Sequence, residues 1–169
     1  MILHIVRHAI AAPRGTAGMP DEERPLTEEG IRKMQQAAAG LNRLGLRPDL
    51  ILSSPLARAL ATAEIVRRAL KEAPEIKVIS GLAPAAKREE IYAQIRKYQK
   101  LDQLMLVGHQ PSLGELAGAI IAGSPECSLE LKKGSLCSIQ IDRVLPEPRG
   151  TLISLLPPSV LRELSRKNS

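Results

Sequence analysis

Aromatic residues are almost missing from this sequence of 169 residues, which has no phenylalanine, no tryptophan and only two tyrosines, Tyr92 and Tyr98. Leucine, isoleucine, valine and alanine must therefore fill the interior, as they do where parallel strands pack against helices. The shortage also argues against a protein that grips single-stranded nucleic acid, because such proteins stack the bases on aromatic rings.

Cysteine and long apolar runs are scarce as well. Cys127 and Cys137 are the only cysteines, and they form neither a metal-binding motif nor a disulfide framework, so we expect two reduced, partly buried thiols in a cytoplasmic protein. Arg7 and His8 interrupt the first apolar stretch before it reaches the length of a signal peptide. No stretch is long enough to span a bilayer, and we expect no membrane partner.

Basic residues exceed acidic ones, with 24 lysines and arginines against 18 aspartates and glutamates. A basic surface can bind nucleic acid or serve a small anionic substrate. No dense Lys/Arg block of the tail type is present, so we expect most of these charges on solvated helix faces and no nucleic-acid partner. The phosphate-binding P-loop, the dinucleotide fingerprint and the G-x-S-x-G nucleophile elbow are absent too.

Strand and helix patterns alternate through the first two thirds of the chain, which we expect to form one domain over residues 1–169. A long loop rich in Ala, Gly and Pro is predicted at 9–25. Strands are predicted at 2–6, 49–53, 76–80, 103–107, 136–141 and 151–156. Helices are predicted at about 28–44 (capped by Thr27), about 54–72 (opened by Ser54-Pro55), 88–99, 112–122 and 158–166. The pattern predicts an α/β three-layer sandwich, a mostly parallel sheet with helices on both faces and the last two strands antiparallel at an edge.

Polar residues follow three of these strands. The first strand ends on Arg7-His8, the second runs into a segment that carries Arg58, and the fourth ends on Gly108-His109. Ligands of open α/β sheets bind beyond the carboxyl ends of the strands, so we expect these side chains to meet. Arginine forks suit phosphate oxygens, and a histidine among such donors can attack phosphorus. The pattern indicates phosphoryl transfer.

Two other chemistries fit these residues poorly. His4 and His8 are about 13 Å apart on one strand at ~3.3 Å per residue, too far to share an ion, and Arg7 would repel a cation. We therefore expect no metal and interpret His4 as a packed, hydrogen-bonded histidine within the sheet. Ser53 and Ser54 are interpreted as turn and cap residues, because the nucleophile elbow is missing.

Three motifs together resemble the histidine phosphatase superfamily, whose fold is phosphoglycerate mutase-like. The Arg-His-Gly signature of that family is matched by V-R-H-A at 6–9, its Ser-Pro-x-x-Arg segment by S-P-L-A-R at 54–58, and its second histidine by V-G-H-Q-P at 107–111. The segment R-P-L-T-E-E-G at 24–30 and the short length are similar to the SixA-type phosphohistidine phosphatase branch. The resemblance covers nearly the whole chain.

The resemblance implies a role for each matching residue. His8 is the implied nucleophile, transiently phosphorylated, while Arg7, Arg58 and His109 clamp the phosphoryl oxygens. Arg24 either contributes from the loop or is a surface residue of that loop. The implied protein is a phosphatase that needs no metal or other cofactor and acts on a phosphorylated protein, such as a histidine-containing phosphotransfer domain.

The sequence departs from the family at Ala9, which replaces the glycine after the histidine, and at Pro84, where many members place a glutamate as proton donor. An alkoxide leaving group needs a proton, and a general acid contributes about 10²–10⁴-fold. A protonated phosphoimidazole is already a good leaving group, so the missing acid favours phosphohistidine as the substrate. Other carboxylates that could donate the proton are Asp21, Glu22, Glu23 and Glu89, with Glu90 beside the last.

Two alternatives stay open on the sequence. One is a small-molecule phosphomonoesterase of the same fold, in which one of these carboxylates supplies the proton. The other is a non-catalytic module on this scaffold that senses phosphate or binds nucleic acid, and whose nucleic-acid affinity would fall steeply with salt.

Overall fold

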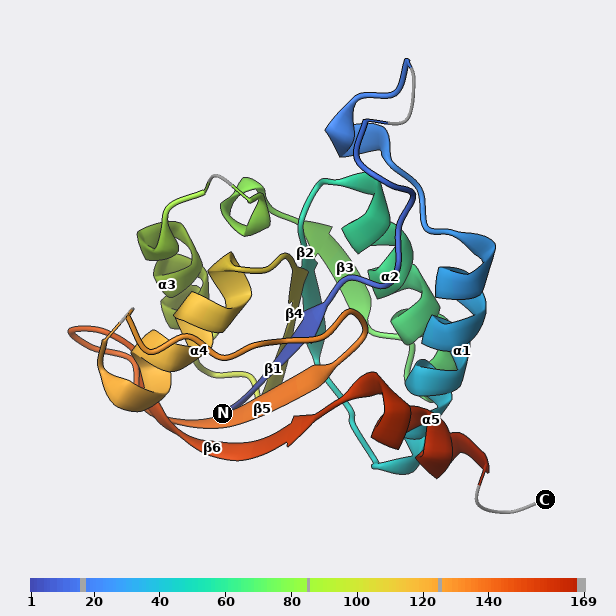
Figure 1. Ribbon diagram of the computed structural model, residues 1–169. Coiled ribbons are helices and arrows are strands. Elements are labelled where there is room, and N and C mark those ends of the chain that lie inside the picture. The colour runs from blue at the N-terminus through green and yellow to red at the C-terminus, as the bar shows by residue number, and fades with distance from the viewer. Residues whose placement is uncertain (16–17, 85, 125, 167–169) are drawn as a thin grey trace.

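A six-stranded sheet forms the centre of the computed structural model, which describes residues 1–15, 18–84, 86–124 and 126–166 (Figure 1). The strands lie in the order β3-β2-β4-β1-β5-β6. They are β1 (Ile2–Arg7), β2 (Leu50–Ser53), β3 (Glu75–Val78), β4 (Gln103–Gly108), β5 (Leu136–Arg143) and β6 (Arg149–Leu156). The first four pair in parallel, whereas β5 runs antiparallel to β1 and β6 to β5. The predicted antiparallel edge is confirmed.

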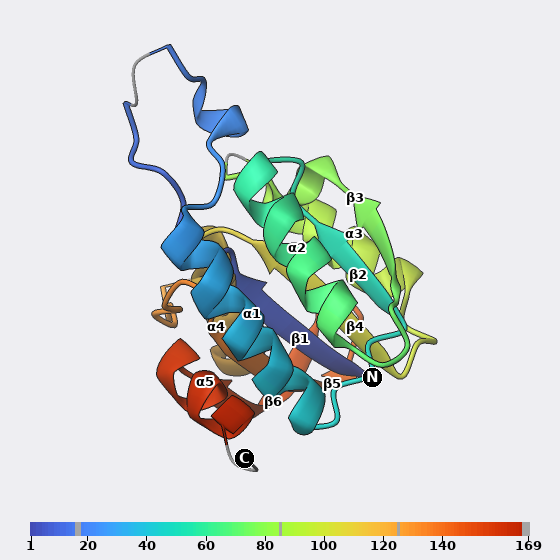
Figure 2. The ribbon, with the colours of Figure 1, turned by 90° about the vertical axis from the view of Figure 1, so that its right-hand side faces the viewer.

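Helices cover both faces of this sheet (Figures 1 and 2). One face carries α1 (Glu28–Arg43), α2 (Ala57–Ala69) and α5 (Pro158–Arg166), and the other carries α3 (Arg88–Lys97) and α4 (Ser112–Ala122). Each face has its own apolar cluster, made almost entirely of aliphatic side chains and alanine. The predicted three-layer α/β sandwich is confirmed, and Tyr92 is the one aromatic side chain among the described buried core residues.

Local sequence signals explain most of the boundaries. Thr27 caps α1 as predicted, because its hydroxyl oxygen accepts a hydrogen bond from the Gly30 amide at 3.0 Å. His4 is a structural residue of the sheet, also as predicted: its Nδ1 lies 2.9 Å from Ser138 Oγ and its Nε2 lies 3.1 Å from Gln103 Oε1.

Within the described residues, no helix combines the length and apolar character needed to cross a bilayer.

Some predictions were wrong in detail. Ser54-Pro55 does not open α2, which begins at Ala57. Ser54 instead accepts a hydrogen bond from the Leu56 amide at 3.3 Å, so the hydroxyl holds a turn before the helix. The second and third helices end at Ala69 and Lys97, earlier than predicted. Short 3₁₀ turns, η1 (Asp21–Glu23) and η2 (Ser80–Leu82), lie where a loop and a strand end were expected.

The two cysteines also differ from the prediction of two partly buried thiols. Cys137 is completely buried in β5 and Cys127 is exposed, and both are free. Burial raises the pKa of the Cys137 thiol to about 12. This thiol therefore stays protonated and behaves as a small apolar side chain of the core.

Candidate active site

The two histidines that follow β1 and β4 lie next to each other. Arg7 and Gly108 are register partners at the ends of these parallel strands, and the His8 amide donates a hydrogen bond to the Gly108 carbonyl oxygen at 2.9 Å. The ring centroids of His8 and His109 are 5.0 Å apart, with the rings tilted by 55°. Neighbouring parallel strands thus deliver both imidazoles to one edge of the sheet.

Both rings open onto a cavity of about 260 Å³, which we call the cage. All five residues that the sequence singled out line it, together with further residues of the loops around it. The lining consists of Arg7, His8, Ala11, Ala12, Pro13, Arg14, Arg24, Arg58, Pro84, His109, Gln110 and Lys133. Five of these side chains are cations, and no aspartate or glutamate is among the described lining residues. Such a cavity suits an anion with several oxygens.

His8 is held in one tautomer. Its Nδ1 lies 2.7 Å from the carbonyl oxygen of Ala9, and because a carbonyl only accepts, Nδ1 carries the proton and Nε2 the lone pair. Burial lowers the pKa of His8 to about 4, assisted by the positive charges of Arg58, Arg7 and Lys133. At neutral pH the ring is uncharged, which is the state in which Nε2 can act as a nucleophile.

His109 is neutral as well. Burial is the main cause that lowers the pKa of His109 to about 3, and electrostatic repulsion from His8 and Arg58 adds to it. Its Nε2 lies 2.8 Å from Ser54 Oγ, while its buried Nδ1 has no partner among the described residues. Ser54 Oγ already accepts the Leu56 amide, and its own proton can go to Nε2. When it does, the ring proton lies on Nδ1, as a donor with no partner among the described residues.

Arg58, on the first turn of α2, is the most deeply buried cation of the cage, with 1% of its surface exposed. Its Nη1 donates to the backbone oxygen of Asp21 at 2.7 Å and its Nη2 to Asp21 Oδ2 at 3.0 Å. Its buried Nε has no partner among the described residues. A buried donor without a partner is costly.

Arg24 belongs to the same arrangement. It is 8% exposed and donates to Asp21 Oδ1 at 2.8 Å and to the Ala12 carbonyl oxygen at 2.6 Å. Of the two interpretations of Arg24, the surface residue is therefore wrong. The structure places the side chain in the wall of the cage, where Asp21 joins it to Arg58.

Asp21 is poorly suited to donate a proton. Burial raises the pKa of its carboxyl group, but the hydrogen bonds and positive charges of Arg24 and Arg58 outweigh that effect and lower the pKa below its usual value. Arg14 adds a third guanidinium, at 3.5 Å. The carboxylate stays ionised and holds the arginines in place.

Like Asp21, the other candidate acids do not line the cage. Glu22 and Glu23 are exposed in η1, and Glu89 is exposed on α3. Pro84 does line the cage, and it stands at the position where many members of the family have a glutamate. The described part of the site thus has cations and neutral imidazoles but no carboxylic acid beside them.

The departure at Ala9 is accommodated without strain. Ala73 is the only described residue other than glycine with a positive φ, so the backbone at Ala9 does not require glycine. The Ala9 amide donates to Thr62 Oγ1 at 3.0 Å, and that hydroxyl donates to the Arg58 carbonyl oxygen at 2.7 Å. This pair of bonds fastens the end of β1 to α2.

A different glycine is required close by. A Cβ on Gly30 would overlap the carbonyl oxygen of Ile10, and the Thr27 amide donates to the same oxygen at 3.0 Å. The N-terminus of α1 therefore lies directly against the segment that follows His8. This contact explains in physical terms why the R-P-L-T-E-E-G segment ends in glycine.

Sequence reasoning missed several residues of the site. Thr62 gave no signal, Gln110 lay in the V-G-H-Q-P motif without a role of its own, and Lys133 was one of two adjacent lysines in a turn. Ser54 was interpreted as a turn and cap residue, and its contact with His109 was not foreseen. Among the described residues, no group of three or more histidines, cysteines or carboxylates is arranged to hold a metal ion.

Comparison with known proteins decides the family. Residues 3–83, which include Arg7, His8, Arg24 and Arg58, match the histidine phosphatase superfamily (branch 1). The chain belongs to this superfamily. A relative from Picosynechococcus sp. (strain ATCC 27264 / PCC 7002 / PR-6), an uncharacterized protein, is 39% identical over 142 residues, which cover 83% of this chain and 85% of the relative.

Solved structures of this superfamily share the fold over nearly the whole chain. The protein histidine phosphatase SixA, complexed with tungstate, has a TM-score of 0.84 at 23% identity and is covered to 99%, against 95% of this chain. A protein from Agrobacterium tumefaciens described as a candidate phosphohistidine phosphatase SixA has a TM-score of 0.77 at 28% identity, with coverage of 97% and 93%. Small-molecule enzymes share the fold too: the alpha-ribazole phosphatase of Shigella flexneri has a TM-score of 0.74 at 20% identity, with coverage of 97% and 94%.

Proposed function

We propose that this phosphatase hydrolyses phosphohistidine on a protein substrate, without a metal ion and through a phosphorylated His8. The observation that carries the proposal is the composition of the cage: a neutral nucleophile and fixed cations, with no carboxylic acid among the described lining residues. Such a site can accept a phosphoryl group but offers no side chain to protonate an alkoxide. The SixA structure that shares this fold is complexed with tungstate, a tetrahedral oxyanion like phosphate, which supports a phosphoryl group as the ligand of the cage.

In the first step, His8 Nε2 attacks the phosphorus of the substrate phosphohistidine in line with the bond to be broken. A new N–P bond forms to His8 and the N–P bond of the substrate breaks, and the substrate imidazole leaves with the electron pair of that bond. Because the leaving ring was a protonated phosphoimidazole, it departs neutral and needs no proton from the enzyme. The Nδ1–H of His8 remains bonded to the Ala9 carbonyl oxygen throughout.

The cage stabilises the phosphoryl oxygens during this transfer. Arg58, Arg7 and His109 all line the cage, and their side chains can donate hydrogen bonds to these oxygens. These groups are already in place, so little reorganisation is needed when charge spreads over the equatorial oxygens. Ser54 is a positioning residue, because its hydroxyl lies 2.8 Å from His109 Nε2 and holds the ring in place.

In the second step, water attacks the phosphorus of phospho-His8. The His8 N–P bond breaks, Nε2 regains its lone pair, and phosphate leaves as H2PO4⁻ with the oxygen and both protons of the water. The low pKa of His8, about 4, makes the neutral imidazole the stable product at neutral pH, which returns the enzyme to its starting state.

The test compares a phosphohistidine peptide with an aryl and an alkyl phosphate, using the wild type and His8→Ala. We expect kcat/KM to fall in the order phosphohistidine, aryl, alkyl, because the demand for a proton rises in that order. His8→Ala removes turnover of all three. Undiminished activity of His8→Ala would overturn the proposed covalent intermediate. An equal kcat/KM for the alkyl phosphate and for phosphohistidine would overturn the proposed substrate.

A small-molecule phosphomonoesterase is the second candidate, favoured by the fold shared with alpha-ribazole phosphatase. It predicts good turnover of alkyl phosphates and a strong loss when one carboxylate, such as Asp21 or Glu89, is replaced. Binding of phosphate without turnover of any substrate would instead indicate a non-catalytic module.

A further inference from the structure

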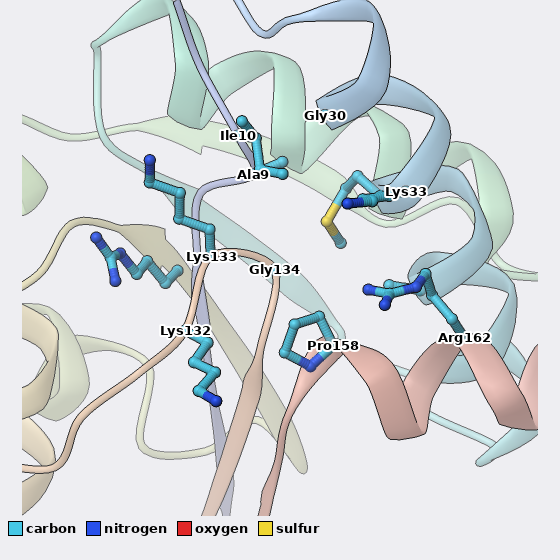
Figure 3. Close-up of a pocket in the computed structure, with 12 residues that line it drawn as sticks. Ala9, Ile10, Gly30, Lys33, Lys132, Lys133, Gly134, Pro158 and Arg162 are labelled. Atoms are coloured by element: carbon cyan, nitrogen blue, oxygen red, sulfur yellow. The ribbon is translucent and has the colours of Figure 1, made fainter. Parts of the chain in front are cut away.

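A second and larger cavity, of about 470 Å³, lies beside the cage. It is enclosed by the end of β1, by α1, by the turn before β5 and by the start of α5 (Figure 3). Five cations line it, and we call it the basic cavity. These cations are Arg7, Lys33, Lys132, Lys133 and Arg162. The sequence motifs of the family do not include the last four.

The positive charge of the basic cavity is compensated only in part, and the negative charge of Glu130 acts on Arg7. No aspartate or glutamate is among its described lining residues. Lys33 forms an ion pair with Glu29, with Nζ 2.6 Å from Oε1. Lys132, Lys133 and Arg162 take part in none of the ion pairs between described residues. In Figure 3 the guanidinium of Arg162 points inward from α5, while Lys133 rises from the turn on the opposite side.

Below these charges the cavity is apolar. Its remaining lining consists of Ala9, Ile10, Gly30, Met34, Ala37, Gly134 and Pro158. At Gly134, where φ is +79°, a side chain would stand 3.4 Å from the Met34 sulfur, so glycine both permits the turn and keeps the space open. A floor of this kind offers no polar side chain to orient a complex small molecule. It fits a short aliphatic stem with a carboxylate head.

The basic cavity and the cage are continuous. Arg7 and Lys133 line both of them, and Lys133 is close enough to lower the pKa of His8. Arg7 is held by a hydrogen bond of 2.7 Å from its Nη1 to the Leu131 carbonyl oxygen. A group bound in the basic cavity can therefore belong to the same molecule as a phosphoryl group bound in the cage.

From this geometry we infer that the basic cavity binds acidic side chains that flank the phosphohistidine of the protein substrate. The inference rests on the proposed function and gives the substrate a sequence character. Cations around the rim of an interface raise the rate of encounter with an acidic partner and fix its register. The cage performs the transfer, and the basic cavity selects which phosphohistidine is presented.

The experiment uses two phosphohistidine peptides that differ only in their flanking residues, glutamate in one and glutamine in the other. For the wild type we expect kcat/KM to be about 10-fold higher for the glutamate peptide, mainly through KM, as for one or two partly screened ion pairs. Arg162→Glu should reduce this preference to about 2-fold or less. Arg162→Lys keeps the charge and should keep the preference.

Arg143→Glu is the matched control. Arg143 is exposed at the far end of β5, and its replacement by glutamate changes the net charge as much as Arg162→Glu does. This control should leave the preference unchanged. Turnover of an aryl phosphate by Arg143→Glu should stay within about 2-fold of the wild type. Circular dichroism and thermal unfolding report the folding of all three variants. Because the rim is exposed, the preference should also shrink at high salt.

Equal kcat/KM for the two peptides in the wild type, or an equal loss in Arg143→Glu, would overturn the inference. A free tricarboxylate that competes as well as the glutamate peptide would also overturn it, in favour of a small-molecule site. Failure of the proposed function looks different: the phosphohistidine peptides would not be hydrolysed at all. Unphosphorylated glutamate peptide would still inhibit aryl phosphate turnover in the wild type more than in Arg162→Glu if the basic cavity binds acidic chains.

Discussion

The cage and the basic cavity share a wall, but two cations that belong only to the cage and two that belong only to the basic cavity are held differently. In the cage, Arg58 and Arg24 are 1% and 8% exposed and both are bonded to Asp21. In the basic cavity, Lys132 is exposed and Arg162 half-buried, and neither forms an ion pair with a described residue. Buried, anchored cations are preorganised for a transition state. Exposed, unanchored ones are suited to recognition, because their charge is screened and their side chains adapt.

The strongest test of this contrast is to remove the anchored cation. Arg58→Ala should lower kcat by about 10²–10³-fold, since it removes a fixed donor aimed at the transferring oxygens. Arg58→Lys should recover little of this loss, because an ammonium cannot reproduce the fork that bonds Asp21. Steady-state kinetics on an aryl phosphate measure both. If Arg58→Ala changed KM alone, as expected for Arg162→Glu on peptides, the distinction between the two regions would be lost.

The anchor itself is the next target. Asp21→Asn should lower kcat by about 10-fold, through misplacement of Arg58 and Arg24, and by the same factor for phosphohistidine, aryl and alkyl substrates. A proton donor would behave differently, because its loss would weigh most on the alkyl phosphate, by about 10²–10⁴-fold. A substrate-dependent loss in Asp21→Asn would therefore return Asp21 to the role of acid.

The contrast between the regions also shows what a sequence can reveal. His8, Arg58 and His109 stand at fixed offsets from strand ends, and parallel pairing brings strand ends together, so periodicity and topology sufficed to predict that they meet. The periodicity of apolar residues likewise predicted the helices and strands, but not their ends. There, single contacts such as that of Ser54 with the Leu56 amide decide the boundary.

The basic cavity could not be predicted in this way. Lys33, Lys133 and Arg162 come from a helix, a turn and the last helix, with no common spacing, and only tertiary packing brings them together. The role of Asp21 was hidden for a related reason. As a loop carboxylate it looked like a proton donor, and only the position of two arginines beside it shows that it stays ionised.

The two regions should also differ in their effect on stability at mildly acidic pH. Burial lowers the pKa of His109 to about 3 and of His8 to about 4 in the folded protein, whereas an unfolded histidine has a pKa of about 6.5. The unfolded chain therefore takes up protons first, and the contribution of these residues is complete above pH ~6.5 and is lost as the pH falls toward 4.

Urea unfolding at pH 7 and pH 5 measures this effect, in a range where the carboxylates are still ionised. We expect a lower free energy of unfolding at pH 5 for the wild type and a smaller difference for His109→Gln. Arg162→Glu should keep the wild-type difference, because no histidine is among the described lining residues of the basic cavity. A pH difference unchanged in His109→Gln would mean that the ring is not held neutral by the cage.

The smallest expected effect concerns Lys133, the exposed cation that belongs to both regions. Its charge contributes to the low pKa of His8, so Lys133→Ala should stabilise the protonated ring and raise that pKa. The acid limb of kcat/KM reports the free enzyme, and it should move to higher pH by a fraction of a unit, as expected for one screened charge. Lys132→Ala is the control, since Lys132 lines the basic cavity but not the cage. An equal shift in both variants would show that the net charge of the turn, and not the position of Lys133 beside the nucleophile, tunes His8.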